Sequence, residues 1–380
     1  MKCFKSIASL GLGAALALSA THALAEDSAS AFAPLKAEIE RQCEAGLFVG
    51  VALVQKGDQT LFSHQCGLAD PANRTPMTLD TRFKIFSTSK SITALTLLSL
   101  SETGEISLDA PLSAYLPRLP SQWQAVTLRQ LLNHSSGIGD YSDQVLIRFS
   151  QNHAATMDRL LDELATADQG LAYETGKDIA YNNFGFELAA HAASKAMGRG
   201  FGELIRERVL EPAGMTSTDV ETEMLIGPHP LIRFDADVAI GYVGTPQALQ
   251  LTGSYSYMQP GAGAVRSSAN DMMKLARAIE DGRIVKPETL AEMSRNLIRK
   301  SDSGEFEAGQ NAGLGLGLFV RNTVAGPDHF HTGGTNGYIT SFGRFVDHDV
   351  AYVLMSARGF TDTEELDRKV AEGVAAAVAR

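Results

Sequence analysis

The sequence predicts an α/β (α+β) fold, in which an antiparallel sheet is flanked by helices and carries a mainly helical lobe. Strand-like runs occur first at 48–66, helical periodicity dominates from about 120 to 285, and strand-like runs return between 313 and 356. We therefore expect the sheet to form from segments near both termini. The predicted single catalytic domain spans 26–380, with a sheet lobe at about 26–86 and 290–380 and a helical lobe at about 87–289.

The N-terminal part predicts a helix followed by a hairpin. A helical pattern covers 32–44, and the turn Lys56-Gly57-Asp58 separates strands at 48–55 and 59–66. Folding this hairpin brings Cys66 back toward the end of the helix that carries Cys43. A disulfide between them is geometrically possible in an oxidising compartment, and two free buried thiols are the alternative.

The next elements surround the first candidate motif. A strand-like approach at 81–86 leads into a helix at 87–103, which ends at Gly104, and 106–112 turns into another short helix. Further helices are expected at 128–132, 157–166, 184–197 and 201–210. The C-terminal part predicts strands at 313–321, 338–346 and 350–356, and a closing helix at 364–378.

The first 25 residues predict a cleaved secretory signal peptide. Lys2 and Lys5 precede a short apolar run, and Ala23-Leu24-Ala25 is an A-x-A cleavage site. We therefore expect cleavage after Ala25, and a periplasmic or secreted protein with no integral membrane segment once the signal is removed. An uncleaved anchor, the alternative, would leave the same domain outside the cytoplasm.

Composition excludes several classes of function. With 44% hydrophobic residues and 20% charged residues, the chain is typical of a globular protein rather than a disordered one. The formal charge of -11 repels phosphate backbones, so nucleic acid is not an expected partner. The nine histidines show no zinc-binding spacing, and no cofactor is expected. The expected partner is a small-molecule or peptide substrate, and the oligomeric state stays open.

Ser87-Thr88-Ser89-Lys90 places a candidate nucleophile and a lysine three residues apart at the start of an apolar helix. Side chains at i and i+3 are neighbours on a helix surface, so the Lys90 amine can reach the Ser87 hydroxyl. A serine needs a neighbouring base to accept its proton, and burial can lower the pKa of a lysine enough for that task. Unpaired N–H groups at a helix N-terminus can also bind a developing oxyanion.

Two further motifs extend the candidate site. Tyr181-Asn182-Asn183 supplies a phenol that needs Lys90 nearby to lower its pKa, and an amide that can donate and accept hydrogen bonds. His331-Thr332-Gly333-Gly334 follows a strand-like segment, where glycines let a substrate approach the backbone and exposed N–H groups can complete an oxyanion hole. Taken singly, each motif has a purely structural explanation, whereas together they favour acyl-transfer chemistry.

The three motifs, S-x-x-K, Y-x-N and [K/H]-T-G, occur once each in the order found in serine β-lactamases and penicillin-binding proteins, which the chain resembles. The similarity is to the branch with class C β-lactamases, DD-peptidases and esterases. Segments 131–137, 211–215 and 261–271 also resemble the family pattern. The resemblance implies a β-lactamase/transpeptidase-like fold.

The resemblance also implies a role for each site residue. Ser87 would be the nucleophile, Lys90 its base or electrostatic partner, and Tyr181 the group that passes a proton to the leaving group. Asn183 would hold the substrate carbonyl. His331 and Thr332 would face the substrate, and the backbone N–H groups of Ser87 and Gly334, next to Gly333, would form the oxyanion hole. His134 would brace the turn under the site.

One departure from the family pattern bears on the substrate. His331 stands where most dedicated β-lactamases carry a lysine, and histidine is mostly neutral at pH 7. We therefore expect a serine hydrolase of the DD-peptidase or esterase type that cleaves an ester, amide or D-peptide bond through an acyl-Ser87 intermediate. The alternatives are a class C-like β-lactamase and, from another class, a non-catalytic penicillin-binding or sensor domain. The natural acyl donor, and whether acyl transfer competes with hydrolysis, stay open.

Overall fold

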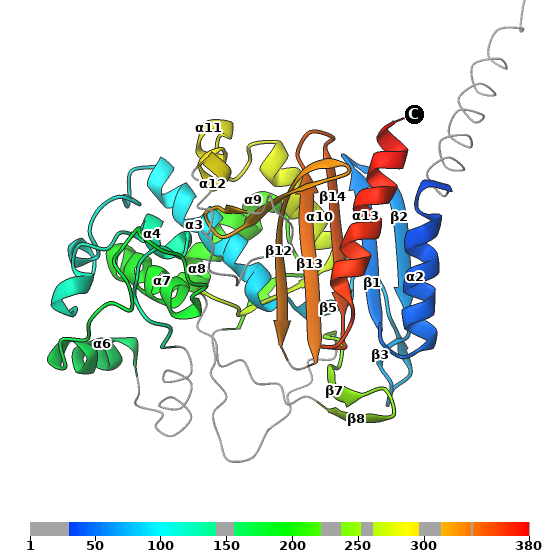
Figure 1. Cartoon of the computed structure of the whole chain (residues 1–380), viewed down its shortest axis with the longest axis horizontal. Coiled ribbons are helices and arrows are strands. Elements are labelled where there is room, and N and C mark those ends of the chain that lie inside the picture. Colours follow the sequence, from blue (N-terminus) through cyan, green and yellow to red (C-terminus); the bar gives the residue numbers. More distant parts are fainter. Residues whose placement is uncertain are drawn as a thin grey trace, which may run out of the picture.

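The computed structural model describes residues 30–141, 156–221, 237–251, 261–295, 313–335 and 337–379. Its central feature is a seven-stranded antiparallel sheet in the order β10-β11-β12-β13-β14-β1-β2 (Figure 1). The strands are β1 (Gly50–Lys56), β2 (Gln59–Cys66), β10 (Gly313–Leu314), β11 (Phe319–Thr323), β12 (Gly326–Thr335), β13 (Tyr338–Phe345) and β14 (Val350–Ser356). The two ends of the chain therefore build one sheet, which confirms the predicted fold class.

The register joins the N-terminal hairpin to the last strand. β1 pairs with β14 from Gly50 opposite Ser356 to Lys56 opposite Val350, and with β2 on its other side. A side chain at Gly50 would meet the carbonyl oxygen of Met355 at 1.8 Å, so the close pairing of β1 and β14 requires glycine there.

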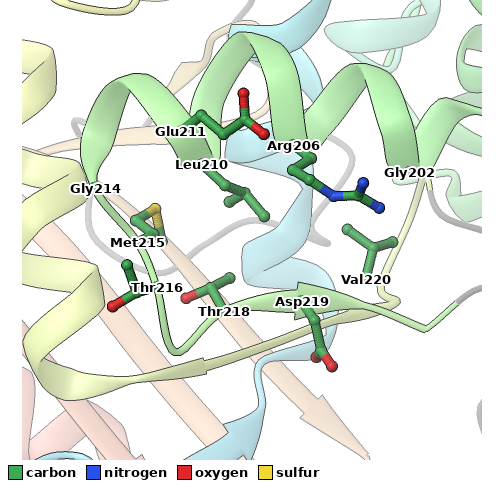
Figure 2. Close-up of a pocket in the computed structure, with 10 residues that line it drawn as sticks. All are labelled: Gly202, Arg206, Leu210, Glu211, Gly214, Met215, Thr216, Thr218, Asp219 and Val220. Atoms are coloured by element: carbon green, nitrogen blue, oxygen red, sulfur yellow. The ribbon is translucent and has the colours of Figure 1, made fainter.

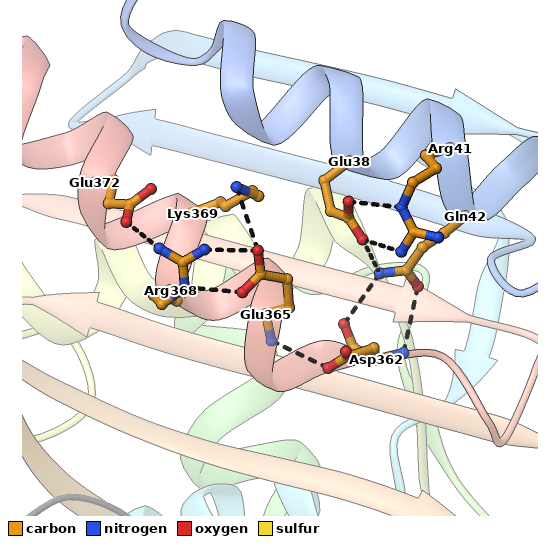
Figure 3. Close-up of polar contacts among 8 residues, drawn as sticks. All are labelled: Glu38, Arg41, Gln42, Asp362, Glu365, Arg368, Lys369 and Glu372. Atoms are coloured by element: carbon orange, nitrogen blue, oxygen red, sulfur yellow. Dashed lines mark hydrogen bonds and ion pairs between the residues drawn. The ribbon is translucent and has the colours of Figure 1, made fainter.

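Two terminal helices, α2 (Ala33–Glu44) and α13 (Thr363–Val378), cover one face of this sheet (Figure 1). Their contact buries Phe32 and Val370 completely, and such side chains each contribute about 1.5–3 kcal/mol to folding. Gln42 exchanges two 3.3 Å hydrogen bonds with the backbone of Asp362 (Figure 3). The exposed ion pairs beside this contact contribute little, so apolar burial holds the two helices together.

A disulfide links α2 to the hairpin. Cys43 at the end of α2 is bonded to Cys66 at the end of β2, with their Cα atoms 6.3 Å apart. Of the two alternatives that the sequence left open, the structure has the disulfide. The bond ties the outer edge of the sheet to the helix that covers it.

The opposite face of the sheet packs against the helical lobe, whose centre is α3 (Ser89–Glu102). Every side chain of α3 from Ser89 to Leu100 is buried, including those of Thr93 and Thr96. The other helices are α4 (Leu128–Leu132), α6 (Met157–Thr166), α7 (Asn183–Met197), α8 (Phe201–Ile205), α9 (Glu211–Ala213), α10 (Ala269–Glu280), α11 (Pro287–Leu290) and α12 (Glu292–Arg295). α10 contacts β1 and β14 directly and so joins the lobe to the sheet.

Three small sheets complete the described chain. β5 (Arg82–Lys84), β9 (Val265–Ser268) and β6 (Asp219–Val220) form one of them, with β9 in the middle. The others are the hairpins β3 (Leu68–Asp70) with β4 (Thr75–Pro76), and β7 (Tyr242–Thr245) with β8 (Ala248–Leu251). Because β5 pairs with β9, the chain just before Ser87 lies next to the segment that begins at Gly261.

One predicted strand is wrong in detail. The strand predicted at 313–321 is a hairpin of β10 and β11, because Gly317 turns the chain with a φ of 67°. The turn predicted at 106–112 leads into a short 3-10 helix, Leu112–Ala114, beside a bridge between Pro111 and Thr127. The helix predicted at 201–210 is present as α8 followed by a π-helix, Arg206–Leu210.

The predicted signal peptide at 1–25 lies outside the described residues. Within the part of the chain that the structure describes, no helix is both long enough and apolar enough to cross a membrane.

Candidate active site

Ser87 lies in a sharp turn between the sheets and the helical lobe. β5 ends at Lys84, a 3-10 turn runs from Phe86 to Thr88, and α3 follows directly. Phe86 has a φ of 44°, which is uncommon for a residue with a side chain and indicates a strained backbone just before Ser87. The Ser87 side chain is half-buried at the start of the helical segment.

The Lys90 side chain is completely buried and ends among three oxygen atoms. Its Nζ lies 3.1 Å from Ser87 Oγ, 2.8 Å from Asn183 Oδ1 and 2.9 Å from the carbonyl oxygen of Ala262. Burial lowers the pKa of Lys90 to about 7, while the negative charges of Glu187 and Asp140 oppose this shift. A large fraction of Lys90 is therefore neutral near pH 7 and can accept a proton from Ser87.

Tyr181 is half-buried beside the same amine, with Lys90 Nζ 5.0 Å from the centre of its ring. Burial raises the pKa of Tyr181 well above its usual value, although a hydrogen bond with Ser87 opposes the shift. From the sequence, Lys90 was expected to lower the pKa of Tyr181. Desolvation of the phenol is the larger effect, so Tyr181 keeps its proton at neutral pH and can donate it.

The His134 ring packs against the Tyr181 ring and holds it in place. Their rings stack with centroids 4.6 Å apart, and His134 Nδ1 accepts a 2.9 Å hydrogen bond from the backbone N–H of Asn182. Burial lowers the pKa of His134 well below its usual value, so the imidazole is neutral. Its place agrees with the bracing role that the resemblance implies.

Asn183 is the first residue of α7, and the end of this helix is capped from two sides. Asn182 Oδ1 accepts from the N–H of Gly185 at 2.7 Å, and the Asp140 carboxylate accepts from the N–H groups of Asn183 and Phe184 at 3.2 Å. These bonds give hydrogen-bond partners to the N–H groups at the start of α7 and fix the position of Asn183 at that helix terminus.

β12 carries the third motif within the strand, not after it as the sequence suggested. A side chain on Gly333 would lie 2.0 Å from the carbonyl oxygen of Ile85 and 2.9 Å from Thr88 N, so only glycine lets β12 pack against the turn that holds Ser87. β11 pairs with β12 only as far as Phe330. In the described sheet, residues 331–335 therefore form an edge, on which Gly334 is exposed and Thr332 half-buried.

His331 lies behind this edge. Its side chain is 2% exposed, its ring centre is 4.9 Å from that of Phe319, and Nδ1 lies 2.6 Å from the Thr332 carbonyl oxygen. A carbonyl only accepts, so Nδ1 carries the hydrogen and Nε2 is left as an acceptor. Burial, and next the charge of Lys90, lower the pKa of His331 to about 3. His331 is thus neutral, and direct contact with a substrate stays a prediction.

The structure therefore gathers Ser87, Lys90, Tyr181, Asn183 and the segment 331–334 around one point between the sheet and the helical lobe. The buried amine is a base, the phenol is a proton donor, and helix and strand backbones surround the serine. Sequence reasoning missed the Ala262 carbonyl, Asp140 and Glu187. Glu187 left a signal, since it lies four residues after Asn183 and so on the same helix face, and Ala262 lies in the segment 261–271 that resembles the family pattern.

A separate cavity of about 480 Å³ lies between the helical segment 202–214 and β6. Arg206 and Leu210 point from the helix toward this strand (Figure 2). Its lining includes none of the predicted site residues. The described residues also hold no group of three or more His, Cys, Asp or Glu side chains that could bind a metal ion.

Comparison with known families agrees with this geometry. The profile of the Beta-lactamase family matches residues 35–377, which is most of the chain. The chain belongs to the Beta-lactamase family. It is thus a serine hydrolase of that family, and the resemblance that the three motifs indicated is confirmed.

Individual relatives in the family are distant. A penicillin-binding protein of Bacillus subtilis is 28% identical over 340 residues, covering 86% of this chain and 72% of the relative. A D-aminopeptidase of Brucella anthropi is 28% identical over 274 residues, covering 72% of this chain and 49% of the relative. The chain thus spans about half the length of that D-aminopeptidase.

Solved structures share the fold. A D-amino acid amidase from Ochrobactrum anthropi has a TM-score of 0.73 at 23% identity, covering 93% of this chain and 99% of that chain. A penicillin-binding protein from Bacillus halodurans has a TM-score of 0.71 at 22% identity, covering 87% of this chain and 98% of that chain. The β-lactamase/transpeptidase-like fold is thereby confirmed.

Proposed function

We propose that this protein is a secreted or periplasmic serine hydrolase that cleaves an ester, amide or D-peptide bond through an acyl-Ser87 intermediate. The observation that carries the proposal is the buried Lys90 amine, 3.1 Å from Ser87 Oγ, with a pKa lowered to about 7. This arrangement supplies the adjacent base that a serine nucleophile needs.

The reaction follows from the proton positions. Lys90 accepts the proton of Ser87 as Oγ bonds to the acyl carbon, and the backbone N–H groups of Ser87 and Gly334 stabilise the oxyanion. Tyr181 gives its proton to the leaving nitrogen or oxygen as that bond breaks, and Lys90 returns a proton to the phenol. Water then attacks the acyl-Ser87 ester. Its proton returns to Ser87 through the same groups, and the acid is released.

The neutral His331 favours substrates other than β-lactams. A lysine at this position would offer a permanent cation to a carboxylate, whereas His331 is uncharged and presents an acceptor nitrogen. The edge at 331–335, where β11 no longer pairs with β12 in the described sheet, is suited to an extended amide-containing substrate, because such a group can pair with a strand edge. The D-aminopeptidases and D-amino acid amidase among the relatives support this substrate range.

The proposed location rests on two features. The first 25 residues have the pattern of a secretory signal, and Cys43 and Cys66 form a disulfide, which persists in oxidising compartments.

Intact-mass analysis over time tests the function. We expect p-nitrophenyl esters, D-amino acid amides or D-Ala-D-Ala peptides to add an acyl group that then leaves, and Ser87→Ala to abolish the adduct. Ser113→Ala, on an exposed side chain, is the matched control and should behave as wild type. Unchanged ester turnover in Ser87→Ala would remove Ser87 from the mechanism. Steady cephalosporin turnover would favour a class C-like β-lactamase instead.

A further inference from the structure

Glu187 is a buried carboxyl group that the mechanism above does not use. It lies on α7, one helical turn after Asn183, and its side chain is 4% exposed. Its Oε2 atom has no hydrogen-bond partner in the described part of the chain. Glutamate is almost never fully buried unless it is paired, because desolvating a carboxylate is costly. Its place next to the catalytic lysine therefore indicates a function beyond packing.

The backbone turn at Gly261 and Ala262 separates Glu187 from Lys90. This turn is pressed onto α7, since a side chain on Gly261 would lie 2.3 Å from the carbonyl oxygen of Phe186. The backbone N–H groups of Ala262 and Gly261 interact with the Glu187 carboxylate. The carbonyl groups of the same two residues face α3.

On the α3 side, two side chains donate to the turn. Thr93 Oγ1 donates to the Gly261 carbonyl at 2.7 Å, and Lys90 Nζ donates to the Ala262 carbonyl at 2.9 Å. The turn is thus held through its carbonyl groups by α3 and through its N–H groups by Glu187. Moving Glu187 would release the carbonyl that fixes the Lys90 amine.

The two ionisable groups also affect each other through the buried space between them. Burial raises the pKa of Glu187 well above its usual value, and the charge of Lys90 opposes this shift. The carboxylate in turn opposes the lowering of the Lys90 pKa by burial. The other ionisable groups around Lys90 are Asp140, which is exposed and better screened, the protonated Tyr181, and the neutral His134 and His331.

We propose that Glu187 is a positioning residue of the acyl-transfer site: its carboxyl group holds the turn whose Ala262 carbonyl accepts the hydrogen bond of the Lys90 amine. The inference rests on the proposed function, because it concerns the base in that reaction.

The test is the rate at which a p-nitrophenyl ester acylates the protein, measured with two variants of Glu187. Glu187→Gln keeps the shape and an acceptor oxygen for the turn and should acylate like wild type. Glu187→Leu removes the acceptor, so the turn loses its support and acylation should slow at least about tenfold. Glu203→Gln, on the exposed face of α8, is the matched control and should leave the rate unchanged. A role in packing alone would leave the rate of the folded Glu187→Leu protein unchanged.

Two outcomes separate the inference from the proposed function. Wild-type protein that forms no acyl-enzyme with any ester would refute the function itself. A folded Glu187→Leu protein that acylates like wild type would refute the role of Glu187 alone.

If Glu187→Leu does not fold, Glu187→Asp provides the second measurement. Aspartate keeps the carboxyl group but is one methylene shorter, so its oxygens withdraw from the N–H groups of the turn. Acylation by Glu187→Asp should then be slower than by Glu187→Gln, although aspartate is the other acid. Equal rates would contradict the inference.

Discussion

Replacing Gly333 with alanine is the sharpest test of how β12 positions the catalytic serine. The new Cβ would lie 2.0 Å from the carbonyl oxygen of Ile85, whereas real Cβ contacts essentially never fall below 3.0 Å. The strand and the turn before Ser87 must then separate by about 1 Å. A misplacement of that size costs roughly 100-fold in rate, and overpacking costs about 1–3 kcal/mol of stability.

The assay combines the rate of acyl-Ser87 formation from a p-nitrophenyl ester with thermal unfolding. Gly334→Ala is the matched control for stability, because its nearest neighbour would be Ile339 Cγ1 at 3.5 Å, an ordinary contact. The control should stay within about 0.5 kcal/mol of wild type. If Gly333→Ala acylated and unfolded like wild type, the close packing of β12 on the turn at 85–88 would have no part in positioning Ser87.

Two other predictions concern protonation and the disulfide. The pKa of Lys90 is about 7, and only the neutral amine accepts a proton, so kcat/KM should fall about tenfold per pH unit well below pH 7. A profile that is flat between pH 5 and pH 8 would exclude Lys90 as the base. Replacing Cys43 and Cys66 with serine removes a disulfide between residues 23 apart in the sequence and should lower the free energy of unfolding by about 3 kcal/mol. Denaturant titration measures this loss, and reduced wild-type protein is the control, which should lose the same amount. Unchanged stability of the double variant would contradict a stabilising role of the disulfide.

Local signals in the sequence predicted much of the fold. The hairpin around Gly57 and the helix at 157–166 agree closely with β1, β2 and α6, since turn chemistry and helical periodicity are properties of neighbouring residues. The contact between Ser87 and Lys90 is also local, because their spacing of three positions along a helical segment brings the two side chains together.

Features that depend on distant contacts were missed. The turn at Gly317 packs closely against α3, which is far away in the sequence. A side chain at Gly317 would lie 2.5 Å from the Lys90 carbonyl oxygen, so this contact requires glycine. The Ala262 carbonyl reaches Lys90 only after β9 pairs with β5. The high pKa of Tyr181 arises from burial by several segments, so its protonation state was not predictable from its sequence neighbours.

The pairing of β1 with β14 has a consequence for the order of folding. Gly50 meets Ser356, so this contact closes a loop that contains most of the chain, including the whole helical lobe. Contacts of such long range form slowly, and an emerging chain cannot make them until its last strands are available. Until then β1 exposes an unpaired, apolar edge that can pair with another molecule. Truncation before Val350 is therefore expected to cause aggregation, even though every catalytic residue would still be present.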